Sequence, residues 1–105
     1  MCIRDRGYEP IYNVTKAALV MFSKCLANEL IGDNIRVNTV TPGWVMTQRQ
    51  IDLWLDEAGE AEIKRAQCLP GKLMSEDIAA MVLFLAADDS KMCTAQDFVV
   101  DAGWT

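Results

Sequence analysis

The chain contains no histidine, and its four cysteines lie far apart, at Cys2, Cys25, Cys68 and Cys93. A zinc site would need all four of these distant thiolates, because imidazole is absent and no C-x-x-C pair occurs. We therefore expect buried, reduced thiols rather than a metal site or a disulfide framework. Reduced thiols are typical of a cytoplasmic protein.

Long apolar segments and an excess of positive charge are also missing. The longest apolar run, residues 78–87, is about half of the roughly 20 residues that a membrane-spanning helix needs. The formal net charge is -5, which leaves no basic surface to attract the phosphates of nucleic acid. We expect neither a membrane nor nucleic acid as a partner.

Apolar periodicity predicts a helix and then a strand in the first half of the chain. Residues 10–30 carry apolar side chains at three- and four-residue steps, which is typical of one amphipathic helix. Gly32 is expected to end it, and Asp33-Asn34 to form the turn that follows. Residues 35–41 are rich in β-branched side chains and predict a strand that ends at Pro42-Gly43.

The second half predicts further helices and one more strand. Residues 47–68 indicate one or two short amphipathic helices broken near Gly59, and Ser75 is a candidate N-cap for the helix after them. That helix is apolar on all sides from 78 to 87 and needs cover on several faces. Residues 98–101 predict a final strand. The order of helix, strand, helices and strand predicts an α/β fold with a parallel sheet. Parallel sheets usually contain more than two strands, so we expect the two predicted here to be part of a larger sheet.

The clearest chemistry lies in Tyr12 and Lys16, which are four residues apart in the predicted first helix. This spacing places both side chains on one face. A cation close to a phenol favours the charged form of the phenol, so the pair could exchange a proton with a hydroxyl or a carbonyl. The spacing alone is weak evidence, because such pairs are common on solvated helices.

Several segments together resemble the short-chain dehydrogenase/reductase family in their order and spacing. They are Tyr12-Asn-Val-Thr-Lys16, Ile35-Arg-Val-Asn38-Thr-Val-Thr-Pro42-Gly43, and the ending from Ser75 to Gly103. The resemblance covers residues 7–105 and implies the C-terminal, catalytic part of a Rossmann-like, doubly wound parallel sheet, incomplete without its N-terminal half. The phosphate-binding loop and the catalytic serine of the family would lie upstream of these segments.

The resemblance implies NAD or NADP as the cofactor of an oxidoreductase. Tyr12 would be the catalytic acid/base, and Lys16 would assist it and hold the ribose hydroxyls of the cofactor. The nicotinamide end would be bound through Pro42, Gly43, Val45 and Thr47. Taken alone, Pro42-Gly43 would be interpreted as a simple turn.

A narrower resemblance, to the sugar 1-dehydrogenases of this family, concerns the substrate. It rests on the segments 42–45, 48–50, 53–54, 67–70 and 86–96. Those enzymes oxidise an aldose at its anomeric carbon to an aldonolactone. Sugars suit aromatic faces and planar hydrogen-bonding groups, which would be supplied here by Trp44, Gln48, Arg49 and Trp54. The alternative is that the tryptophans pack their segment against the core.

Two other hypotheses compete with the sugar dehydrogenase. One is a reductase of 3-oxoacyl or other ketone substrates from the same family. The other is an inactive, truncated chain with only an assembly surface. The resemblance also implies a homo-oligomer, a tetramer or a dimer, at full length, and we expect the 105 residues alone to be inactive.

Residues 1–6 match nothing in the family. We interpret them as a non-native leader, with a divergent loop as the alternative, and residues 7–105 as the C-terminal catalytic part of the domain.

Overall fold

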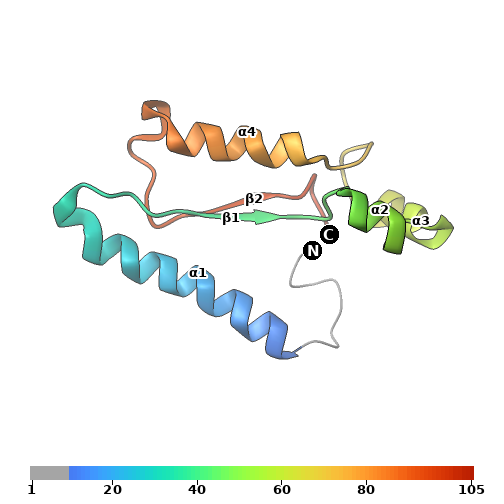
Figure 1. Ribbon diagram of the computed structural model, residues 1–105, viewed down its shortest axis with the longest axis horizontal. Coiled ribbons are helices and arrows are strands. Elements are labelled where there is room, and N and C mark those ends of the chain that lie inside the picture. Colours follow the sequence, from blue (N-terminus) through green and yellow to red (C-terminus); the bar gives the residue numbers. More distant parts are fainter. Residues whose placement is uncertain (1–9) are drawn as a thin grey trace.

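The computed structural model describes residues 10–105, so the predicted leader at 1–6 lies outside the described residues. The elements follow in the order α1 (Pro10–Leu30), η1 (Ile31–Asp33), β1 (Thr39–Pro42), α2 (Gln48–Trp54), α3 (Glu57–Ala66), α4 (Ser75–Ala86), η2 (Asp88–Ser90) and β2 (Asp97–Val100). Figure 1 shows α1 and α4 on opposite sides of the two strands, with α2 and α3 beyond one end of them. Within residues 10–105, no helix is long and apolar enough to cross a membrane.

The two strands form a parallel pair, which confirms the predicted α/β class. Thr39 is in register with Asp97, and Pro42 with Val100. The predicted strand at 35–41 is paired only from Thr39 onward. The reason lies in its partner, because Ala95 has a left-handed φ of 59° that interrupts the extended backbone before β2 begins.

Helix α1 has the predicted bounds, but the residue that ends it is not the predicted Gly32. The chain passes through the 3-10 turn η1 and then turns at Asn34, which has a φ of 58° and whose N–H donates to the Ile31 carbonyl. Asparagine tolerates this left-handed conformation better than most residues do. Of the described residues in α1, Ala27 alone is buried.

The break between α2 and α3 falls at Leu55 and Asp56, so its predicted position near Gly59 is wrong. Asp56 is the N-cap of α3, and its carboxylate accepts a 2.8 Å hydrogen bond from the Gly59 N–H. Gly59 is buried in the first turn of α3. A Cβ there would lie 2.8 Å from the Trp54 carbonyl oxygen and 3.0 Å from the Trp44 ring. This glycine therefore permits a close approach and does not break a helix.

Helix α4 begins at Ser75, which is its first helical residue and not the predicted N-cap. The N-cap is Met74, whose N–H donates a 2.7 Å hydrogen bond to the Asp77 carboxylate three residues later. We predicted that this apolar helix needs cover on several faces. In the structure that cover is missing, because none of the described residues in α4 is buried and Leu83 is 69% exposed.

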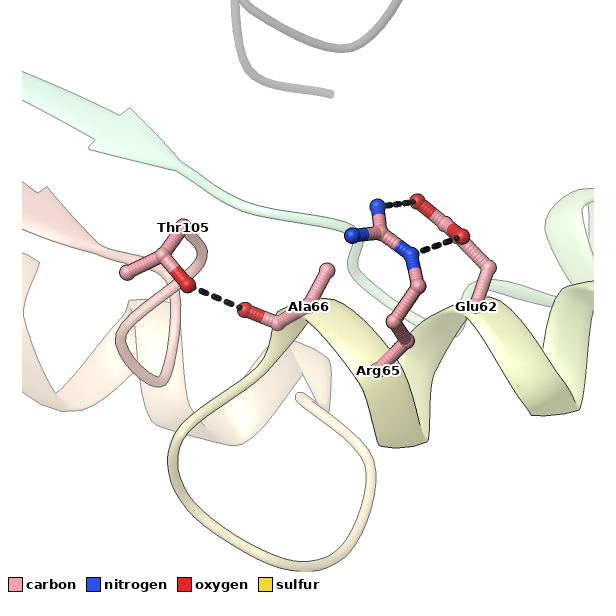
Figure 2. Close-up of polar contacts among 4 residues, drawn as sticks. All are labelled: Glu62, Arg65, Ala66 and Thr105. Atoms are coloured by element: carbon pink, nitrogen blue, oxygen red, sulfur yellow. Dashed lines mark hydrogen bonds and ion pairs between the residues drawn. The ribbon is translucent and has the colours of Figure 1, made fainter.

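Most of the buried apolar side chains lie near the carboxyl ends of the strands. They come from α3 and from the loops after β1 and α3, and they are Met46, Ile63, Ala66 and Leu73; Ala27 in α1 is the remaining one among the described residues. On the outer face of α3, the Arg65 guanidinium donates two hydrogen bonds to the Glu62 carboxylate, at 2.9 and 2.6 Å (Figure 2). The hydrogen bond from Arg65 holds the pKa of Glu62 below its ordinary value. Both groups are exposed, so solvent screens the pair.

Candidate active site

Tyr12 and Lys16 lie one turn apart at the start of α1 and face the same way. The Lys16 ammonium lies 5.5 Å from the centre of the Tyr12 ring, within the range of a cation–π contact. The predicted juxtaposition of phenol and ammonium is therefore present. Its catalytic role remains a prediction.

Both side chains line a cavity of about 210 Å³ between α1 and β1. Leu19 and Val20 complete the helical wall, and the opposite wall is the whole of β1, Thr39–Pro42. Two titratable groups thus meet a mostly apolar surface at the strand that ends in Pro42. The structure brings together Tyr12, Lys16 and Pro42, three of the residues to which the family resemblance gives a role in the site.

Gly43 lies just outside this cavity wall and is buried against the end of β2. Its N–H donates to the Val100 carbonyl at 2.9 Å. A Cβ at position 43 would lie only 2.6 Å from the Cβ of Asp101, closer than two carbon atoms can approach without a shift. The absence of a side chain therefore lets the loop after β1 pass directly over the end of β2.

Val45 and Thr47 continue this loop toward α2. Val45 forms an isolated parallel bridge with Leu73, and its carbonyl accepts a 2.9 Å hydrogen bond from the Thr47 N–H. Thr47 is the N-cap of α2, where its hydroxyl oxygen accepts from the Gln50 N–H at 3.4 Å. Because a hydroxyl also carries a donor, the Thr47 side chain keeps a proton to offer to a ligand.

The predicted substrate residues divide into two pairs. Trp44 is engaged internally, because its indole N–H donates to the Gln50 side chain at 2.8 Å and its ring meets Trp104 edge to face at 6.3 Å. The alternative interpretation, a tryptophan that packs its segment, therefore describes Trp44. Gln48 donates to the Asp52 carboxylate at 2.8 Å.

The other pair, Arg49 and Trp54, lies on the surface of α2, where Trp54 is 48% exposed. Sequence reasoning did not single out Trp104, although it holds Trp44 from the far end of the chain. The only available signal was a third tryptophan with no local explanation. Among residues 10–105, no group of three metal-ligating side chains is close enough to hold an ion.

Most of the chain is similar to known dehydrogenases and reductases. A family model described as enoyl-(acyl carrier protein) reductase matches residues 4–105. The D-xylose 1-dehydrogenase of Caulobacter vibrioides (strain NA1000 / CB15N) is 47% identical over 94 residues, which are 90% of this chain and 38% of that protein. The chain thus spans less than two fifths of the length of this curated relative.

Solved structures agree with the sequence matches. A short-chain type dehydrogenase/reductase from Mycobacterium ulcerans has a TM-score of 0.88 and 28% identity, covering 96% of this chain and 37% of that one. L-sorbose reductase from Gluconobacter frateurii, in complex with NADPH and L-sorbose, has a TM-score of 0.81 and 35% identity, covering 97% and 43%. These likenesses confirm the predicted Rossmann-like class, of which the chain covers a part.

Proposed function

Because this chain belongs to the short-chain dehydrogenase/reductase family, we propose that it supplies the catalytic part of an NAD(P)-dependent oxidoreductase. Tyr12 is the acid/base in this proposal, and Lys16 assists it. The observation that carries the proposal is the shared cavity, in which the phenol and the ammonium face β1 and Pro42. The Lys16 ammonium lies over the ring whose hydroxyl would exchange the proton.

The residues around the cavity fit the nicotinamide end of such a cofactor. The Lys16 ammonium has three donors for ribose hydroxyls, and Val40 and Pro42 in the cavity wall offer apolar surface to a flat ring. Gly43 allows the loop after β1 to lie close to the end of β2, and Thr47 keeps a hydroxyl proton for a carboxamide or a phosphate. When bound, a nicotinamide group supplies the hydride acceptor or donor of the reaction.

We infer that the substrate is an aldose, oxidised at its anomeric carbon to an aldonolactone. Tyr12 takes the proton of the anomeric hydroxyl while the hydride leaves the anomeric carbon, so the carbon is oxidised and the tyrosine is protonated. One similar protein is named for the oxidation of an aldose, the D-xylose 1-dehydrogenase. Arg49 and Trp54 are exposed on α2 and offer a cation and an aromatic face to a sugar ring. Gln48 contributes its amide beside Asp52.

A ketone reductase is the second candidate. It is favoured by one observation, that a similar solved structure is named a 3-oxoacyl-[acyl-carrier protein] reductase. In that reaction Tyr12 would give a proton to the carbonyl oxygen of a 3-oxoacyl group. An inactive chain with only an assembly surface is the third candidate.

The test uses the completed enzyme, by which we mean a chimera that has residues 10–105 in place of the matching part of the Caulobacter D-xylose 1-dehydrogenase. The completed enzyme is given xylose, galactose, arabinose, fucose or rhamnose with NAD+ or NADP+, and the reduced nicotinamide is measured. We expect at least one sugar to be oxidised. Reduction of a 3-oxoacyl thioester without sugar oxidation would favour the second candidate, and no turnover of either would favour the third.

A further inference from the structure

The last five residues of the chain run alongside the end of α3. The Thr105 N–H donates to the Ala66 carbonyl at 2.8 Å, and the Cys68 N–H donates to the Gly103 carbonyl at 3.1 Å. Gln67 and Trp104 form an antiparallel bridge between these bonds. Figure 2 shows the Thr105 hydroxyl directed at the same Ala66 carbonyl, at 3.2 Å. The segment 101–105, which we call the C-terminal clamp, thus holds the end of α3 through its backbone.

The same clamp lies against the loop that follows β1. Asp101 is the residue that a Cβ on Gly43 would meet at 2.6 Å. The Asp101 carboxylate accepts a 2.9 Å hydrogen bond from the Gly103 N–H, and Gly103 has a φ of 75°. A Cβ on Gly103 would lie 2.8 Å from the Cβ of Cys68. The clamp therefore packs closely against Gly43 on one side and against Cys68 on the other.

Trp104 extends the clamp to α2. Its ring meets Trp44 edge to face, at 6.3 Å and 75°, and the Trp44 indole N–H donates to Gln50 within α2. The Trp44 ring also lies over Gly59, at the start of α3. One aromatic pair thus connects the end of the chain to both helices.

The two helices differ in how firmly they are held. Three residues of α3 are buried, Gly59, Ile63 and Ala66, whereas none of the residues of α2 is. Helix α3 is therefore a fixed base. Helix α2, which carries Arg49 and Trp54 on its surface, depends on that base and on Trp44 for its position.

We propose that the C-terminal clamp positions α2 for the substrate, and that Trp104 is the main positioning residue. This inference rests on the proposed function, in which α2 carries the substrate-binding side chains. Trp104 acts through Trp44 and Gln50 and touches neither the Tyr12 hydroxyl nor the Lys16 ammonium in the cavity between α1 and β1. Its loss should therefore weaken substrate binding while leaving the chemistry and the cofactor largely intact.

The experiment compares Trp104→Ala, Trp104→Phe and Glu62→Gln in the completed enzyme. Trp104→Ala should raise KM for the sugar about five- to tenfold, with kcat and the Kd of NAD(P)H changed by less than about twofold. Trp104→Phe keeps an aromatic edge and should restore most of the wild-type KM. Glu62→Gln changes the exposed face of α3 only and should behave as wild type. A KM for Trp104→Ala within twofold of wild type would overturn the proposal, and so would a parallel loss of kcat and cofactor affinity.

A second measurement does not depend on turnover. Hydrogen exchange at the Cys68 and Leu69 amides, which donate to the clamp, and in α2 should be faster in Trp104→Ala than in Trp104→Phe, while exchange in α1 and α4 stays unchanged. If this pattern appears but no sugar is oxidised, the clamp stands and the sugar assignment fails. If exchange is unchanged or rises throughout the chain, the clamp itself is refuted. Should Trp104→Ala be insoluble, Trp104→Leu retains much of the volume without the aromatic edge and is read by the same criteria.

Discussion

The Lys16 ammonium lies over the ring of Tyr12, 5.5 Å from its centre and one helical turn along α1. The distance is short enough for the positive charge to act on the phenol, and both groups line one cavity against β1. Neither residue is held in a buried network, and Tyr12 is 41% exposed. The pair is therefore accessible to a ligand that enters between α1 and β1.

Replacing Tyr12 by phenylalanine removes the hydroxyl and keeps the ring beneath Lys16. If the hydroxyl transfers the proton, kcat of the completed enzyme should fall by about 10²- to 10⁴-fold. The Kd of NAD(P)H should change little, because the ring and the ammonium remain in place. Steady-state kinetics and fluorescence titration of the cofactor measure the two effects. Near-normal turnover in Tyr12→Phe would remove tyrosine from the mechanism.

Replacing Lys16 by methionine removes the charge and keeps a chain of similar length. We expect both kcat and cofactor affinity to fall by about tenfold or more, because one ammonium would serve the phenol and the ribose hydroxyls. Lys24→Met is the matched control, since Lys24 is exposed on the same helix and outside the cavity wall. Equal effects of the two substitutions would show that the charge of α1 as a whole matters, and not the place of Lys16.

Gly43 and Gly32 provide a paired test of the close approach between the loop after β1 and the end of β2. A Cβ at position 43 would lie 2.6 Å from Asp101, whereas a Cβ at position 32 would have no atom within 4 Å. Gly43→Ala should reduce the free energy of unfolding by about 1–3 kcal/mol. Gly32→Ala should be neutral or slightly stabilising, because alanine restricts the unfolded chain more than glycine does. Urea denaturation of the two variants measures the difference, and equal stabilities would contradict the close approach.

The parts of the fold that depend on local signals could be predicted from the sequence. The bounds of α1 follow from its apolar period and from Pro10 in its first turn. The start of β1 could not be predicted, because it depends on the left-handed Ala95 in the partner segment. The break between α2 and α3 was misplaced because a glycine required by tertiary contact was interpreted as a local breaker.

The candidate site shows the same division between local and distant causes. Tyr12 and Lys16 could be paired because a helix places residues four apart on one face. Internal packing of Trp44 was one of two interpretations, but its partner could not be predicted, because Trp104 lies far along the chain and no local pattern links the two. The role of an aromatic side chain in this region is therefore set by its tertiary partners, as it is for Trp44.

The last prediction concerns the 105-residue chain by itself, whose two long helices leave apolar side chains in water. Phe22 in α1 is 61% exposed and Leu83 in α4 is 69% exposed, on helices that Figure 1 shows on opposite sides of the strands. Apolar surface of this extent favours association, and the cavity beside Tyr12 and Lys16 offers contacts to only one end of a dinucleotide. We therefore expect the isolated chain to self-associate in light scattering and to show no NAD(P)H binding in a fluorescence titration at micromolar concentrations.

The double variant Phe22→Glu and Leu83→Glu should reduce the association, whereas Met92→Glu, at an exposed position beyond η2, should reduce it less. A monodisperse monomer that binds the cofactor at micromolar concentration would show that these helices need no cover and that the part of the site present here is sufficient.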